Sequence, residues 1–184
     1  MNKYYEPISE TIDKTAARVV KYTHERGLSP GTAERCTGGT LSAAVTSVPE
    51  TSAVFVGGAV TYSAEMKTAM IGVSSGTIKT FSVYSHETAR KTAAGICPVT
   101  GADIGVGITG IAGSGGGTKE MPVGTVFVAV SLKGGVMSKE LELYEKTGGT
   151  EPDRRTVGEP AVPGSPEWLP GLPGAEKEVG RECQ

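Results

Sequence analysis

A unit near the N-terminus, from Leu28 to Val48, constrains the fold of this chain more than any other stretch. Its first part, Leu28 to Glu34, predicts a strand that enters the core, although Pro30-Gly31 is expected to interrupt the hydrogen-bond ladder. Thr37-Gly38-Gly39 then predicts a tight turn, and Thr40 to Val48 returns to helical spacing before a proline stops it. A strand, a glycine turn and a helix in this order direct backbone N–H groups at an anion. The unit therefore predicts an anion-binding turn.

Helices and strands alternate along the rest of the first 147 residues. The apolar residues between Ile8 and Arg26 are spaced for one helical face, and Gly27 is placed to end that helix. Ser63 is a suitable N-cap for a helix from Ala64 to Met70. The other expected elements are a strand from Ala53 to Tyr62 that is bent or bulged at Gly57-Gly58, a helix from Ser85 to about Gly95, and strands Asp103 to Thr109, Val123 to Leu132 and Val136 to Tyr144. The alternation predicts a layered α/β/α domain, with an antiparallel pair formed by the last two strands.

The length and composition set the domain organisation. A chain of 184 residues can bury one sizeable core, so we expect a single domain over residues 1–147. Residues 148–184 are dense in proline and glycine and have no periodicity. They predict an irregular tail.

Charge and hydropathy argue against several classes of protein. The net charge is −2 and no run of Lys or Arg is present, which argues against a nucleic-acid-binding surface and favours a small polar substrate. No apolar run has the length of a membrane span, and residues 1–7 lack the apolar centre of a signal peptide. We therefore expect a cytoplasmic protein that binds neither nucleic acid nor membrane.

The cysteines and histidines argue against a metal site. Cys36, Cys97 and Cys183 are odd in number and have no metal-ligand spacing, so reduced thiols are expected. His24 and His86 have no acidic or cysteine partner nearby in the sequence. A zinc site or a Ser-His-Asp triad therefore has few residues from which to form.

Ser52, Tyr62 and Lys67 form a candidate catalytic group. A serine hydroxyl is a poor nucleophile until a base takes its proton, and a lysine is the available base here. Lys67 would need burial or a neighbouring cation to disfavour its ammonium form. From spacing alone an alternative stays open, in which Ser52 is a turn residue, Tyr62 lies in the core and Lys67 is solvated.

Two glycine-rich segments are candidate binding loops. Thr37-Gly38-Gly39 and the loop from Gly110 to Gly117 could bring backbone N–H groups to a phosphate or to a developing oxyanion. Glycine loops are also common as plain connections, and neither segment continues into the Lys-Ser/Thr of a Walker motif.

Several short motifs between Thr32 and about Tyr144 resemble the CinA C-terminal domain family, whose active members are nicotinamide mononucleotide deamidases. The matching segments are Ala33-Glu34, Cys36-Thr37-Gly38-Gly39, Ser52-Ala53-Val54-Phe55, Gly58-Ala59-Val60-Thr61-Tyr62-Ser63, Lys67, Gly72-Val73, Thr109-Gly110-Ile111-Ala112-Gly113 and Pro122-Val123-Gly124-Thr125-Val126. Each motif alone is weak, but their order and spacing together are specific.

The resemblance implies an α/β fold, a three-layer α/β/α sandwich with a mixed, mostly parallel sheet, and a homodimer. It implies an amidohydrolase that converts nicotinamide mononucleotide and water to nicotinate mononucleotide and ammonia, in pyridine nucleotide recycling, without metal or cofactor. Ser52 corresponds to the family nucleophile, assisted by Tyr62 and Lys67. Thr109 corresponds to an active-site threonine that helps backbone N–H groups stabilise the oxyanion. The residues expected to bind the substrate nucleotide are Arg35, Thr37, Gly38, Gly39, Gly110 and Arg154.

Arg35 departs from the family pattern, because active members commonly have a serine at this position. Its cation could pair with the substrate phosphate or lower the pKa of Lys67, or its side chain could fill the pocket. The segment from Val157 onward also lacks resemblance to the closing helix of the family. These departures leave two alternatives to an active deamidase: a catalytically impaired domain that binds nucleotides or partners, and a structural module that binds no ligand.

Overall fold

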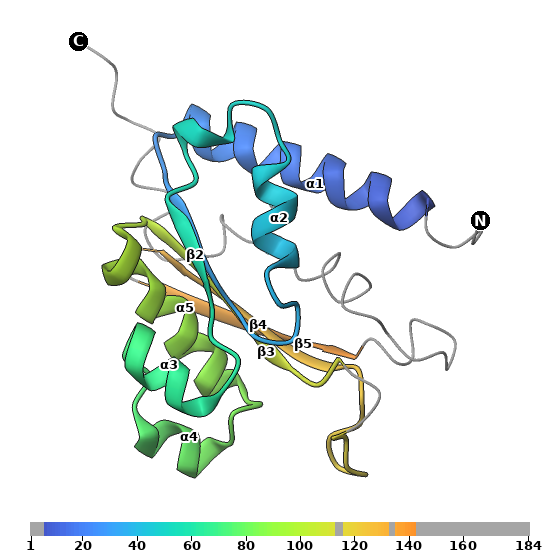
Figure 1. The fold of residues 1–184 in the computed structure, drawn as a ribbon, viewed down its shortest axis with the longest axis vertical. Coiled ribbons are helices and arrows are strands. Elements are labelled where there is room, and N and C mark those ends of the chain that lie inside the picture. The colour runs from blue at the N-terminus through green and yellow to red at the C-terminus, as the bar shows by residue number, and fades with distance from the viewer. Residues whose placement is uncertain (1–5, 113–115, 133–134, 143–184) are drawn as a thin grey trace.

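The computed structural model describes residues 6–112, 116–132 and 135–142, which form a five-stranded sheet between two layers of helices (Figure 1). Helices α1 and α2 cover one face of the sheet, and α3, α4 and α5 lie on the other. In chain order the elements are α1 (Glu6–Glu25), β1 (Pro30–Glu34), α2 (Thr40–Thr46), the 3₁₀ turn η1 (Thr51–Ala53), β2 (Gly57–Val60), α3 (Ala64–Ile71), α4 (Ser75–Phe81), α5 (His86–Thr100), β3 (Ile104–Gly110), β4 (Thr125–Leu132) and β5 (Gly135–Glu142).

The strand order is β2-β1-β3-β4-β5. The strands β2, β1 and β3 are parallel, whereas β4 runs antiparallel to both of its neighbours. The carboxyl ends of β1, β2 and β3 therefore lie along one edge of the sheet, which is where ligands bind in open α/β sheets. The arrangement confirms the predicted α/β/α sandwich with a mixed, mostly parallel sheet.

The strand β1, which lies between β2 and β3, corrects the expectation that Pro30-Gly31 would interrupt its ladder. Pro30 is the first residue of the strand, a position at which a missing N–H costs no ladder bond. Its carbonyl accepts a hydrogen bond from the Val56 N–H at 3.2 Å. The ladder is continuous, with Gly31 paired to Gly57 on one side and to Gly105 on the other.

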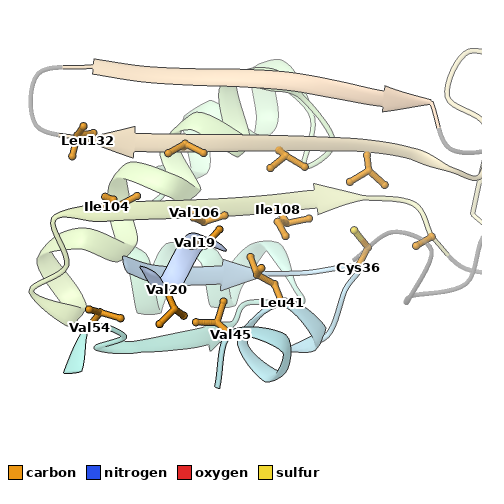
Figure 2. Close-up of a cluster of buried hydrophobic side chains, with 14 residues drawn as sticks. Val19, Val20, Cys36, Leu41, Val45, Val54, Ile104, Val106, Ile108 and Leu132 are labelled. Carbon is orange, nitrogen blue, oxygen red and sulfur yellow. The ribbon is translucent and has the colours of Figure 1, made fainter. Parts of the chain in front are cut away.

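The largest apolar cluster lies between the sheet and the helices α1 and α2 (Figure 2). Alternate residues of β3 and β4 point to this face because side chains of a strand alternate between its two sides. The buried members of the cluster are Val19, Val20, Cys36, Leu41, Val45, Val54, Ile104, Val106, Ile108, Ala112, Val126, Val128, Val130 and Leu132. This core holds β3 and β4 against α1 and α2, and β3 is one of the strands that carry the candidate site.

On the opposite face, α5 packs directly against the backbone of β3. A Cβ atom on Gly105 would collide with the Ala93 carbonyl oxygen, and one on Gly107 would lie 2.6 Å from the Ala89 carbonyl oxygen. Both positions therefore require glycine because a larger side chain would not fit, and not because the backbone adopts a conformation that favours glycine. The close approach joins α5 to the centre of the sheet.

Several local predictions are confirmed, and others need correction. Ser63 caps α3 by accepting a hydrogen bond from the Met66 N–H at 3.1 Å, as expected. The helix α5 begins after its N-cap Ser85 but continues past Gly95 to Thr100. Gly95 does not end the helix; it leaves room for the Ile71 carbonyl, against which a Cβ would collide.

The segment before α3 also differs from its prediction. Residues Thr51–Ala53 form η1, and only Gly57–Val60 form β2, which pairs with β1 residue by residue and without a bulge. Gly58 is needed because a Cβ there would collide with the Thr32 hydroxyl. The helix α4 has no counterpart in the sequence prediction, since it is short and buries none of its side chains. None of the helices in the described ranges is both long and apolar enough to cross a bilayer.

Candidate functional site at the carboxyl edge of the parallel strands

Polar side chains from three neighbouring strands meet at the carboxyl edge of the sheet. Arg35 directly follows β1, Tyr62 is the second residue after β2, and Thr109 is the penultimate residue of β3. Lys67 reaches the same place from α3, the helix that begins after β2. The structure thus brings together four of the site residues expected from the sequence.

Lys67 is the most unusual residue of this site, because its side chain has no exposed surface. Its Nζ donates a hydrogen bond to the Thr61 hydroxyl at 3.2 Å. Within the described part of the chain, no carboxylate forms an ion pair with it. Burial, with a smaller contribution from the Arg35 cation, lowers the pKa of Lys67 to about 8. A substantial fraction of this amine is therefore neutral near physiological pH.

The Arg35 guanidinium lies against two tyrosine rings. Its Cζ is 4.8 Å from the ring centroid of Tyr62 and 4.6 Å from that of Tyr84. One nitrogen, Nη1, donates to the Gly110 carbonyl at 2.9 Å. Arg35 therefore fills space at the strand ends, one of the three roles considered for it, and its charge also opposes protonation of Lys67.

Thr109, predicted to help stabilise the oxyanion, and Gly110, predicted to bind the substrate, both contact other parts of the chain in the structure. The Thr109 hydroxyl donates to the Val83 carbonyl at 2.7 Å, and the side chain is fully buried. Gly110 contributes its carbonyl to Arg35 rather than an N–H to an anion. Thr109 instead anchors the loop that carries Tyr84, because Val83 directly precedes this tyrosine.

The glycine turn after β1 already holds an anion, the carboxylate of Glu34. Its Oε2 accepts hydrogen bonds from the N–H groups of Gly39 and Leu41 at 3.0 and 3.1 Å. Its Oε1 accepts from the N–H and the hydroxyl of Ser42 at 2.9 and 2.6 Å. The Gly38 N–H donates to the Arg35 carbonyl. These backbone donors therefore have an internal partner, and the binding of a substrate phosphate at this turn stays a prediction.

We expect Glu34→Gln to lower the free energy of unfolding by about 2 kcal/mol, since hydrogen bonds to a buried charge are replaced by weaker ones and an amide NH₂ faces N–H donors. Urea unfolding followed by circular dichroism measures this loss. The matched control is Glu120→Gln, because Glu120 is exposed. Equal stability of the two variants would show that the carboxylate does not organise the turn.

Ser52 lies away from this site. It belongs to η1, which precedes β2, whereas Tyr62 and Lys67 follow β2. Figure 1 shows the turn between α2 and β2 at one end of that strand and α3 at the other. The Ser52 side chain is exposed. Within one copy of the chain, the predicted pairing of Ser52 with Lys67 is therefore wrong, because the whole of β2 separates them.

Other candidate residues have more limited roles or lie outside the described residues. Burial raises the pKa of the Cys36 thiol to about 11, so it is protonated at neutral pH. The Thr37 hydroxyl is buried and has no hydrogen-bond partner within the described ranges. Arg154, residues 113–115 of the second glycine loop and the whole segment 148–184 lie outside the described residues.

Three residues of the site were missed by the sequence reasoning: Glu34, Thr61 and Tyr84. A glutamate placed before a glycine turn and a helix is a signal for Glu34, since its carboxylate can reach the free N–H groups of that helix. Thr61 could have been noted because it precedes Tyr62 in the motif that contains Lys67. Tyr84 has no local signal, because only the fold brings it to Arg35.

Comparison with known proteins identifies the family of this chain. The model of the CinA C-terminal domain matches residues 12–157. The chain belongs to the CinA C-terminal domain family. A CinA-like protein of Akkermansia muciniphila is 39% identical over 140 residues, which are 76% of this chain and 33% of that protein. A CinA-like protein of Thermotoga maritima is 41% identical over 143 residues, 70% of this chain and 35% of that protein. The chain thus spans about a third of the length of these relatives.

Solved structures of CinA proteins share the fold. The competence/damage inducible protein CihA from Agrobacterium tumefaciens is 35% identical, with a TM-score of 0.77 over 86% of this chain and 93% of that one. The competence damage-inducible protein A (ComA) from Klebsiella pneumoniae is 30% identical, with a TM-score of 0.74 over 93% of this chain and 99% of that one. The CinA fold assigned from sequence motifs is therefore confirmed.

Proposed function

We propose that this CinA C-terminal domain is an amidohydrolase that converts nicotinamide mononucleotide to nicotinate mononucleotide and ammonia. The observation that carries the proposal is the buried Lys67, hydrogen-bonded to a hydroxyl at the carboxyl edge of the parallel strands. A buried amine with a lowered pKa, paired with a hydroxyl, is the arrangement required for nucleophilic attack on an amide. The specific substrate is taken from the family resemblance. The homodimer and the cytoplasmic location stay predictions.

Among the described residues of a single copy of the chain, the hydroxyl that Lys67 contacts is that of Thr61. Lys67 in its neutral form accepts the Thr61 proton as the hydroxyl oxygen attacks the carboxamide carbon. The proton then passes to the departing ammonia, and water hydrolyses the resulting ester to give the acid and the free hydroxyl. With a pKa of about 8, about a tenth of Lys67 is neutral at pH 7.

The position of Arg35 predicts that this activity is slow. Its guanidinium contacts the Tyr62 ring and binds the Gly110 carbonyl, so it must move before a substrate can reach Thr61 and Lys67. The same observation favours a second function, a nucleotide-binding domain without turnover. A binder would show a rise in melting temperature with the mononucleotide but no ammonia release.

Ammonia release from nicotinamide mononucleotide tests the proposal with four proteins: the wild type, Arg35→Ser, Thr61→Val and Ser52→Ala. We expect Arg35→Ser to release ammonia about tenfold faster than the wild type, because it clears the entrance. Thr61→Val should lose the activity, whereas Ser52→Ala should retain it, since Ser52 lies beyond the far end of β2.

The results for these four proteins distinguish between the two candidate nucleophiles and between the two candidate functions. Loss of activity in Ser52→Ala, with Thr61→Val active, would overturn Thr61 as nucleophile and place Ser52 of a second copy in the site. Absence of ammonia release from both the wild type and Arg35→Ser, with binding retained, would favour the nucleotide-binding domain.

A further inference from the structure

We propose that the rings of Tyr62 and Tyr84 form a recognition site for a planar cation, and that the Arg35 guanidinium occupies this site in the free chain. As a statement about substrate class, the inference rests on the proposed function, because the nicotinamide ring of the mononucleotide is a pyridinium. As a statement about binding, it stands on the geometry alone. We call the two rings the tyrosine pair.

The tyrosine pair is assembled by the fold from two distant segments. Tyr62 follows β2, the strand on one side of β1, and it is 57% exposed. Tyr84 follows Val83, whose carbonyl is held by Thr109 of β3, the strand on the other side of β1. Arg35 leaves the end of β1 between these two strands. Its guanidinium carbon is within 5 Å of both ring centroids.

Few hydrogen bonds hold the Arg35 guanidinium, so a ligand can replace it. Its Nη1 has one acceptor, the Gly110 carbonyl, and its buried Nε has no hydrogen-bond partner in the described ranges. No carboxylate in those ranges forms an ion pair with it. A structural arginine usually has its donors satisfied, because an unpaired buried donor is costly. The cation is instead held mainly by the faces of two aromatic rings.

A pyridinium ring shares the properties through which the tyrosine pair holds Arg35. Both groups are flat and carry a delocalised positive charge, and the negative face of an aromatic ring attracts such a cation. A nicotinamide ring in place of the guanidinium could also donate a carboxamide N–H to the Gly110 carbonyl, the acceptor that Arg35 uses. The residue at position 35 therefore determines whether the site is open to a cationic ring.

Calorimetric titration with N-methylpyridinium tests the inference, since this probe carries the cationic ring but no amide to hydrolyse. We expect Arg35→Ala to bind it about tenfold more tightly than the wild type does, and more tightly than it binds neutral pyridine at pH 8. Adding Tyr84→Leu to Arg35→Ala should remove most of this gain. The matched control is Arg26→Ala, which removes another arginine whose guanidinium carbon lies 3.7 Å from a ring centroid, that of Tyr22.

Equal affinity of the wild type and Arg35→Ala for N-methylpyridinium would overturn the inference, as would equal binding of pyridine and N-methylpyridinium by Arg35→Ala. A gain in Arg26→Ala as large as that in Arg35→Ala would also overturn it. Because the probe cannot be hydrolysed, these results are independent of ammonia release. Tight binding of the probe without turnover of the mononucleotide would support the cation site and contradict the amidohydrolase.

Discussion

Replacing Lys67 by methionine is expected to reduce ammonia release from nicotinamide mononucleotide by about a thousandfold while the chain remains folded. Methionine nearly matches the length of the buried lysine stem but cannot accept the proton of the Thr61 hydroxyl. Steady-state ammonia release at saturating substrate, measured alongside circular dichroism, gives both quantities. Activity within threefold of the wild type would remove Lys67 from the mechanism.

The same substitution makes a prediction about stability and pH. Because the pKa of Lys67 is about 8 in the folded chain and higher in the unfolded chain, unfolding takes up a proton between about pH 8 and pH 10. The free energy of unfolding of the wild type, relative to Lys67→Met, should therefore rise with pH in this range. At pH 7 we expect the methionine variant to be more stable by up to about 3 kcal/mol.

The matched control for the activity measurement is Lys79→Met, at an exposed lysine of α4. It should leave ammonia release unchanged. A wild-type stability that falls relative to Lys67→Met above pH 8 would show that the folded chain does not disfavour the Lys67 cation.

Gly105→Ala is expected to lower the free energy of unfolding by about 3 kcal/mol. The added Cβ would collide with the Ala93 carbonyl oxygen and lie 2.7 Å from the Cys97 Sγ. The collision with Ala93 is with helix backbone, so α5 has to move away from β3 as a unit rather than rotate one side chain. Urea unfolding measures the loss.

Gly76→Ala, in the exposed helix α4, is the control for the glycine substitution. Its Cβ would meet only the Ser74 Oγ, at 3.7 Å, and alanine favours a helix over glycine by up to about 1 kcal/mol. We expect this variant to be as stable as the wild type or slightly more so. A loss of less than 1 kcal/mol in Gly105→Ala would show that α5 can move off the sheet at little cost.

Much of the fold could be predicted from local patterns. Ser63 identified the start of α3 because a capping hydroxyl is a property of a few neighbouring residues. The strands β3, β4 and β5 were each anticipated from continuous or alternating apolar residues. Gly95 was misread because the reason for its presence, the Ile71 carbonyl, lies on another helix.

The candidate site was harder to predict, because its residues are brought together by the topology. Tyr62 and Lys67 were identified from the motif after β2, and the structure places both at the carboxyl edge. Ser52 is only ten residues from Tyr62 in the sequence, yet a strand between them carries the chain to the other edge of the sheet. Spacing along a chain indicates proximity within a helix or turn, but not across a strand.

The contact between α5 and β3 also determines which parts of this domain can move. Helix backbone meets strand backbone without intervening side chains at Gly105 and Gly107, so α5 can neither slide along β3 nor tilt away from it without losing contacts over two turns. The middle of α5 is thereby held against β3. The helix α4, which buries no side chain, is free of this constraint. The Ile71 carbonyl at the end of α3 meets α5 at Gly95 in the same close way, so α4 is the part of this helix layer that can move with the least loss of buried contacts.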